Sequence, residues 1–191
     1  DVFLRAAKQA VGRMPNRRFR FLVIGDGSRR AELERMTAQS GLSEAVRFTG
    51  FVPDVAPLYR LMRLHVNASR GTETSCLAVS EAMSAGVPEL VSDYGGNREM
   101  IGESLAGIVF PEGNVNALAD AICRVAGDGK LEVSMRRAAV LRYRRTHDRP
   151  PDGGVQRNVS GSYRALSGRI PFTAHIGVPG MRCGNGICSA F

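Results

Sequence analysis

Several kinds of segment are missing from this chain of 191 residues. No apolar run approaches the roughly 20 residues that a membrane-spanning helix needs. The opening stretch, residues 1–8, predicts an amphipathic helix and not a signal peptide. With no export signal, we expect a cytoplasmic protein. The chain also lacks a starting Met, so we expect it to belong to a longer protein.

The spacing of the four cysteines is not typical of a disulfide-rich domain or of a metal site. Cys76 and Cys123 fall in predicted helices, where buried free thiols are common. Cys183 and Cys188 have four residues between them. That spacing is wider than zinc pairs usually have, and no second pair follows. We therefore expect no metal site and no structural disulfide.

Lysine is scarce, since only Lys8 and Lys130 stand among the 26 basic residues, and the net charge of +8 is unevenly placed. Residues 1–129 carry 15 basic and 15 acidic side chains, whereas residues 130–191 carry 11 and 3. A basic C-terminal third suits acidic lipid or nucleic acid, although a solvated basic helix explains it more simply. Peripheral membrane contact is left open, and no nucleic-acid partner is expected.

Short apolar runs typical of buried strands alternate with helical patterns from residue 1 to about residue 127. This alternation implies parallel strands joined by right-handed crossovers, hence an α/β, Rossmann-like open sheet with helices on both faces. Strands are expected at 19–24, 46–49, 64–68, 90–92 and 107–110. Helices are expected at 2–14, 28–40, 54–62, 97–101, 114–127 and around Glu81. We predict one domain over residues 1–146 and an irregular basic tail over residues 147–191, where Gly and Pro are frequent and only residues 163–166 suggest a short helix.

Glycine-rich stops follow the predicted strands, at the edge where open parallel sheets bind ligands. Gly25-Asp-Gly27 opens a helix, so its backbone could approach a phosphate. A tight turn is the simpler explanation of these two glycines alone. Arg30 stands where the dinucleotide fingerprint has its third glycine, so a nicotinamide cofactor is not expected.

Glu73 and Glu81 stand eight positions apart, which is about 12 Å of rise on one helix. If the helix starts near Ser75, Glu73 lies in the loop at its mouth and Glu81 lies one to two turns inside. A loop charge and a surface glutamate would give the same spacing by chance. Two observations argue against coincidence. Residues 76–79 are too apolar for an exposed helix face, and a buried carboxylate needs hydrogen-bond partners, such as sugar hydroxyls.

Five motifs then occur in one order along residues 1 to about 127. They are Gly25-Asp-Gly27; Val46-Arg-Phe-Thr-Gly50 with Pro53-Asp54; Ser69…Glu73…Glu81-Ala-Met…Gly86-Val-Pro88; Ser92-Asp-Tyr-Gly-Gly96 with Glu99; and Gly107-Ile-Val-Phe-Pro111. Together they resemble the C-terminal, nucleotide-sugar-binding half of GT-B retaining glycosyltransferases (family 4).

The resemblance implies transfer of a sugar from a nucleoside-diphosphate sugar to an acceptor, a glycan or a lipid, with retention of anomeric configuration and without a metal or other cofactor. Glu73 would sit at the transferred sugar near the reaction centre, and Glu81 would hold the ribose hydroxyls. Three groups of residues complete the implied donor site: backbone amides of Thr74, Ser75 and Cys76 at the diphosphate, Phe51 and Val52 by the base, and Gly25, Gly27, Gly95 and Gly96 where the backbone approaches the donor closely.

The chain also departs from the family. The diphosphate-binding Arg and Lys lie before the first helix in the family and are not in this sequence, and neither is the acceptor domain. The strand before that loop is central in the family's sheet, of order 3-2-1-4-5-6, so we expect a gap between the first and third strands here. Glu89 stands where an apolar residue is usual. The isolated chain is therefore expected to be catalytically incomplete.

Two other functions remain open. A sugar-nucleotide epimerase of the same architecture would need acid and base groups near the sugar. His65 is the only histidine before residue 147, and its alternation within a strand favours a packed core residue. The second alternative is a non-catalytic remnant that binds nucleotide sugars or anions and whose basic tail contacts lipid or nucleic acid.

Overall fold

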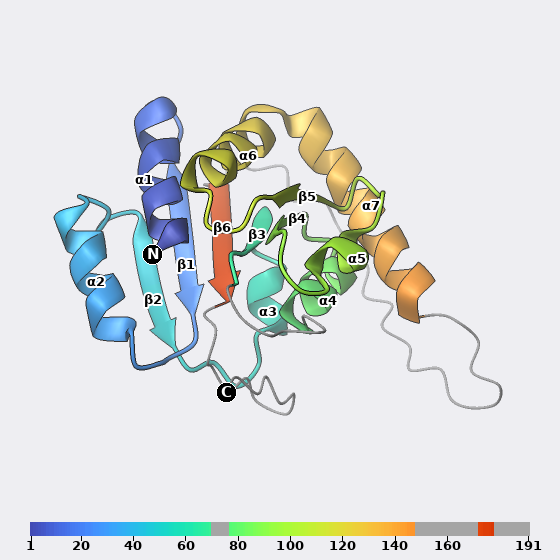
Figure 1. Ribbon diagram of the computed structural model, residues 1–191, viewed down its shortest axis with the longest axis horizontal. Helices are drawn as coiled ribbons and strands as arrows, with labels where there is room; N and C mark the ends of the chain where they lie inside the picture. The colour runs from blue at the N-terminus through green and yellow to red at the C-terminus, as the bar shows by residue number, and fades with distance from the viewer. Residues whose placement is uncertain (70–76, 148–171, 178–191) are drawn as a thin grey trace.

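The computed structural model describes residues 1–69 and 77–147 and the backbone of residues 172–177. In these residues one parallel sheet of six strands has the order β2-β1-β6-β3-β4-β5 (Figure 1). The strands are β1 (Phe19–Ile24), β2 (Val46–Gly50), β3 (Leu64–Asn67), β4 (Glu89–Ser92), β5 (Gly107–Phe110) and β6 (Phe172–Gly177). The helices are α1 (Val2–Arg13), α2 (Arg30–Gln39), α3 (Ala56–Tyr59), α4 (Leu77–Ser84), α5 (Asn97–Ile101), α6 (Val115–Gly127) and α7 (Gly129–His147).

The elements predicted over residues 1–127 are confirmed, and local capping sets several of their ends. The Asp1 side chain accepts a hydrogen bond from Val2 N at 2.8 Å, and the Asn114 side chain accepts one from Ala117 N at 3.0 Å. Such caps satisfy backbone donors that the first helical turn leaves unpaired. The predicted helix over 54–62 is shorter than expected, although Asp54 does accept from Ala56 N at 3.0 Å.

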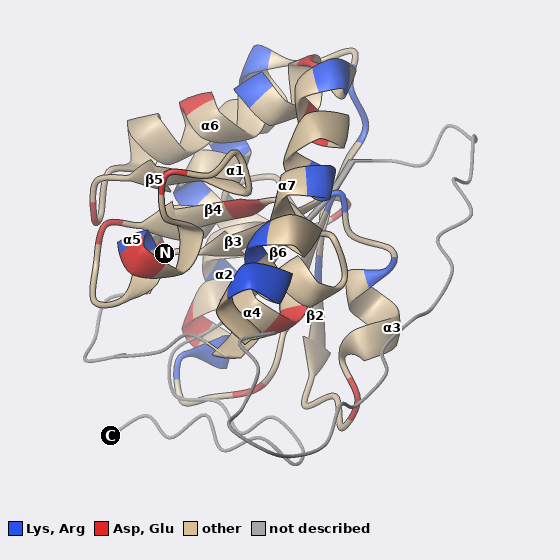
Figure 2. Ribbon diagram, turned by 90° about the vertical axis from the view of Figure 1, so that its right-hand side faces the viewer, with Lys and Arg blue, Asp and Glu red and all other residues tan. Residues whose placement is uncertain are grey.

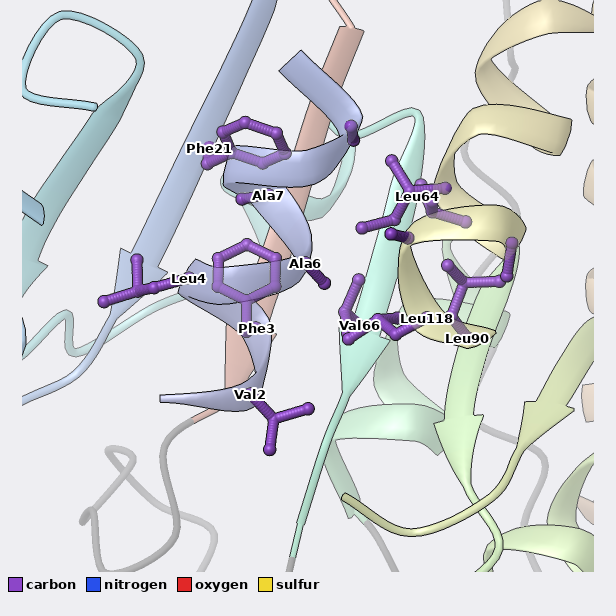
Figure 3. Packing of buried hydrophobic residues seen from close by; sticks show 14 of the residues in the cluster. Val2, Phe3, Leu4, Ala6, Ala7, Phe21, Leu64, Val66, Leu90 and Leu118 are labelled. Atoms are coloured by element: carbon purple, nitrogen blue, oxygen red, sulfur yellow. The ribbon is translucent and has the colours of Figure 1, made fainter. Parts of the chain in front are cut away.

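Alternate side chains of each strand face opposite layers of helices. Leu64 and Val66 of β3 join an apolar cluster with α1 and α6, which Figure 3 shows from close by. Within it, the ring of Phe21 meets that of Phe3 edge-on at 5.6 Å and stacks on that of Phe19 at 5.5 Å. The other face lies under α3, α4, α5 and the C-terminal half of α7.

The expected gap between the first and third strands is wrong. Strand β6 lies there, parallel to both neighbours, with Phe21 and Leu64 each in register with Ala174. Figure 1 shows it in red between β1 and β3. Part of the stretch that we expected to be irregular thus forms a central strand, because the open edges of β1 and β3 offer unpaired backbone groups that a sixth strand satisfies. The remaining residues of that stretch, including the short helix expected at 163–166, lie outside the described residues.

Helix α7 carries six of the eleven basic residues that the sequence holds after residue 129. Its one acidic residue, Glu132, is buried and forms ion pairs with Arg63 and Arg136. Met135 and Ala139 are buried on the same side of the helix. Among the described residues, no helix is both long and apolar enough to cross a bilayer.

Candidate functional site at the carboxyl edge of the sheet

The turn after β1 and the turn after β2 are joined by backbone. Gly25 N donates to Gly50 O at 2.9 Å, and both glycines have positive φ, 111° and 69°. A Cβ on Gly50 would meet only the movable end of the Arg30 side chain, at 3.0 Å, so the positive φ is what favours glycine at this position. Phe51 follows with a half-exposed ring. The structure therefore brings the predicted residues of these two strand ends to one place.

Gly27 precedes α2, but ion pairs occupy the entrance of that helix. Gly27 N donates to Asp26 Oδ1 at 2.9 Å, and the Arg30 guanidinium bonds Asp26 at 3.2 Å and Glu34 at 2.8 Å. These hydrogen bonds raise the pKa of Arg30. The arrangement matches the tight turn that we gave as the simpler explanation, with Gly27 next to a helix start.

Glu81 is exposed in the second turn of α4. The hydroxyl of Tyr59, from α3, donates to Glu81 Oε2 at 3.3 Å. Partial desolvation raises the pKa of Glu81, while the Tyr59 hydrogen bond and the nearby His65 act in the opposite direction. The expectation of burial is thus wrong for Glu81 itself, because its helix turns this side chain outward while Ala82 and Met83 pack inward.

Val52, one of the two predicted base-contacting residues, packs against the same apolar cluster as the neighbours of Glu81. Ala82 and Tyr59 belong to a cluster that also holds Ile24 and Met62, and Val52 packs against it. A carboxylate and the strand end at Val52 are therefore held by the same small core. A ligand with a planar apolar part and vicinal hydroxyls fits such a pair of neighbours, because rings pack on apolar side chains and hydroxyls donate to carboxylates.

Gly95 and Gly96 lie at the end of β4, beside a buried polar network. Asn97 donates from its amide to Ser92 O at 3.1 Å, and Ser92 Oγ donates to Ser69 O at 3.0 Å. Ser69 N in turn donates to Asn67 Oδ1 at 3.0 Å. These bonds fix the ends of β3 and β4 relative to each other, directly before the segment 70–76. Glu73, Thr74, Ser75 and Cys76 lie in that segment, outside the described residues.

His65 and Glu89 form a fully buried pair that sequence patterns only hinted at. They stand side by side in β3 and β4, with His65 Nδ1 and Glu89 Oε2 2.6 Å apart and no exposure of either side chain. Burial raises the pKa of Glu89, and His65 offsets part of that rise. The prediction of a packed core histidine is confirmed. Enclosure in the core also removes His65 as the surface acid or base that an epimerase would need.

Tyr59 is the contact of this site that sequence reasoning missed. It is 22 residues from Glu81, and no local pattern links the two. For Glu89 a signal existed, since a carboxylate in an apolar strand needs a partner and His65 alternates in the preceding strand along the chain. Among the described residues, no group of three or more His, Cys, Asp or Glu side chains gathers as metal ligands would.

Comparison with known proteins matches this architecture. The family described as "Glycosyl transferases group 1" matches residues 1–128. The chain belongs to this glycosyltransferase family. A 2-deoxystreptamine glucosyltransferase of Streptomyces kanamyceticus is 34% identical over 128 residues, 65% of this chain and 33% of that relative. The chain spans about a third of the length of the curated relatives that it matches.

Two solved structures are similar in fold. The C-terminal domain of a glycosyl transferase group 1 family protein (LpcC) from Francisella tularensis has a TM-score of 0.67 at 23% identity, over 78% of this chain and 79% of that chain. A TarM variant from S. aureus, in complex with fondaparinux, alpha-GlcNAc-glycerol and UDP, has a TM-score of 0.70 at 21% identity, over 77% and 29%. This chain has the fold of the C-terminal, Rossmann-like half of a GT-B glycosyltransferase.

Proposed function

We propose that this chain is the donor half of an enzyme that transfers a sugar from a nucleoside-diphosphate sugar to a glycan or lipid acceptor, with retention at the anomeric carbon. Family membership supports glycosyl transfer, and the observation that carries the donor site is the exposed Glu81 carboxylate, hydrogen-bonded by Tyr59, whose cluster Val52 also contacts. The retaining outcome rests on the motif that joins Glu73 to Glu81.

Glu81 would bind the ribose of the donor. A carboxylate offers about four lone-pair positions. The Tyr59 hydroxyl uses one of them on Oε2, which leaves Oε1 to accept from two vicinal hydroxyls. The base would lie against Phe51 and Val52, which follow the end of β2; Phe51 is half exposed, and Val52 packs against the cluster that holds Tyr59.

The reacting end of the donor would lie at the segment before α4. Glu73 would face the transferred sugar, and the backbone amides of Thr74, Ser75 and Cys76 would donate to the diphosphate as negative charge develops on it. Gly95 and Gly96 would let the backbone approach there without side-chain clashes. We assign no metal or other cofactor to this site. Acceptor binding is left to a further domain, so this chain by itself should bind donor without transferring sugar.

Nucleotide titration tests the proposal. Calorimetry with UDP, GDP and their sugars should show binding of one nucleotide series by this chain. Glu81→Gln removes a charged acceptor of nearly equal shape, and hydrogen bonds to charged groups contribute about 1.5–3 kcal/mol, so affinity should fall tenfold or more. Tyr59→Phe should cost less, about 0.5–1.5 kcal/mol, because it only releases the Glu81 side chain.

The matched control is Glu44→Gln. Glu44 is also an exposed glutamate, but it lies just before the amino end of β2, whereas the candidate site is at the carboxyl ends of the strands. The Glu44→Gln variant should therefore bind nucleotide as the unchanged chain does. Equal nucleotide affinity of the Glu81→Gln variant and this control would refute the site assignment. Sugar transfer by this chain alone would refute the proposal that acceptor binding requires a further domain.

A further inference from the structure

The basic residues of α7 divide into an inner set and an outer set. Arg136 donates to the Gly86 and Met62 carbonyls and pairs with Glu132, and Arg142 donates to the Met100 and Glu99 carbonyls. These two arginines attach the helix to the fold. Four further cations, Lys130, Arg137, Arg144 and Arg145, are exposed, and none forms an ion pair with a residue that the structure describes.

The outer cations line one face of the helix. Positions 130, 137, 141, 144 and 145 follow the three-and-four spacing that places side chains on one stripe, opposite Glu132, Met135 and Ala139. The stripe is about 22 Å long at 1.5 Å per residue. Figure 2 looks onto α7 and shows its Lys and Arg segments in blue. This outer face carries no acidic side chain, since Glu132 is the only acid of the helix and is buried.

Large apolar side chains are exposed on the same face and beside it. Val133 and Leu141 of α7 are 50% and 55% exposed, and Leu61 and Leu105 in adjoining turns are 60% and 63% exposed. Leu61 precedes Met62, whose carbonyl binds Arg136, and Leu105 precedes Ala106, which packs in one cluster with Ala139. Four of the six large hydrophobic side chains exposed in the described residues thus gather around α7.

We propose that this outer face of α7 binds the surface of an anionic lipid bilayer. Cations interleaved with aliphatic side chains match a surface of phosphate headgroups over acyl chains, because the charges meet the headgroups while the apolar residues enter the boundary below them. Nucleic acid is the less suitable partner, since this face presents aliphatic groups where base-binding surfaces present aromatic or hydrogen-bonding ones. Asp128, the C-cap residue of α6, directly precedes α7. The proposal is independent of glycosyl transfer.

Vesicle flotation of the full chain tests the surface. The chain should float with vesicles of phosphatidylcholine and phosphatidylglycerol and not with phosphatidylcholine alone, and added salt should release it. Each cation near such a surface changes affinity about fivefold, so Arg137→Ala with Arg144→Ala should weaken binding about 25-fold. Leu141→Ser should weaken binding while leaving its salt dependence unchanged.

Arg35→Ala with Arg47→Ala is the matched control, because it removes the same charge from exposed positions on α2 and β2. It should change vesicle affinity less than twofold. Equal losses in the two double variants would show that only net charge matters and would overturn the proposal. Preference for duplex DNA over vesicles would overturn it in favour of nucleic acid. Circular dichroism checks that each variant folds, and nucleotide titration of the same samples reports separately on the donor site.

Discussion

The two faces of the sheet are built from different chemistry. The face under α1 and α6 is closed by aromatic and aliphatic side chains, among them Phe3, Phe21 and Leu118. The opposite face holds the buried His65–Glu89 pair. Its layer also carries Glu81. The face under α1 and α6 serves only to stabilise the fold. The opposite face also contains buried ionisable side chains, and it lies near the candidate donor site.

The two faces therefore differ in whether they contain buried ionisable groups, whose desolvation lowers the stability of the fold. An apolar face contributes stability in proportion to the area that it buries, and it carries no pH dependence of its own. A buried ionisable pair contributes less net stability because desolvation opposes its attraction. Glu89 shows the cost directly, since its Oε1 makes no hydrogen bond to any described residue. Each of the following changes probes one face against the other.

Removal of β6 should have the largest effect, because both faces share it. A chain ending at residue 171 would leave β1 and β3 without the strand between them and divide the sheet into two parts. We expect loss of cooperative thermal unfolding, measured by circular dichroism. A chain ending at residue 177 keeps every described element and serves as the control. Cooperative melting of both truncated chains would show that the two parts of the sheet hold together without β6.

Phe21→Ala tests the apolar face. Phe21 is fully buried between Phe3 and Phe19, and truncation of a core Phe costs about 3–5 kcal/mol because a cavity remains. Urea unfolding should show this loss at every pH. In the folded fraction the nucleotide affinity should be unchanged, since the residue belongs to the other face. A loss that varies with pH would contradict a purely apolar role.

His65→Leu tests the polar face by leaving Glu89 buried without its partner. Removing one member of a buried pair costs about 3–5 kcal/mol, whereas replacing both members with apolar residues is often neutral. The double variant His65→Leu with Glu89→Leu should therefore recover most of the loss. Urea unfolding of the unchanged chain, the single variants His65→Leu and Glu89→Leu, and the double variant gives the coupling free energy. Additive losses in the double variant would mean that the two side chains do not act as a pair.

The pH dependence of the free energy of unfolding should also distinguish the two faces, with a smaller effect than the substitutions above. Burial raises the pKa of Glu89 above its ordinary value of 4.5. The folded chain therefore keeps a proton that the unfolded chain releases. The contribution of Glu89 to the free energy of unfolding should be greatest below pH 4.5 and be lost as the pH rises through its raised folded pKa. Glu89→Gln should flatten this part of the profile, whereas Phe21→Ala should shift the whole profile without changing its slope.

Local patterns predicted most of the first 127 residues, because apolar period and end signals are properties of short segments. The run 19–24 predicted β1 to the residue, and Asn114 marked the start of α6. Glycines after the strands predicted the ligand edge, since parallel strands end together. Family motifs then supplied roles for Glu81, Phe51 and Val52 that spacing alone could not.

Three features could not be predicted from local patterns. Residues 172–177 lie between Pro171 and Pro179 in a stretch without period, and pairing with β1 and β3 is what makes them a strand. The Tyr59–Glu81 contact and the partnership of His65 with Glu89 each join residues more than 20 positions apart. No short window contains both members of such a pair.

The sequence by itself determined the alternation of strands and helices, the excess of positive charge after residue 129 and the family of the chain. These features follow from side-chain periodicity and motif order, which are properties of short segments, and from charge, which is a sum over residues. Only the tertiary structure decided that a late segment fills the centre of the sheet, that Glu89 is held by His65, and that α7 turns four cations outward while two others bind the fold. The physical reason is that strand pairing, desolvation and the facing of a helix depend on which distant groups meet.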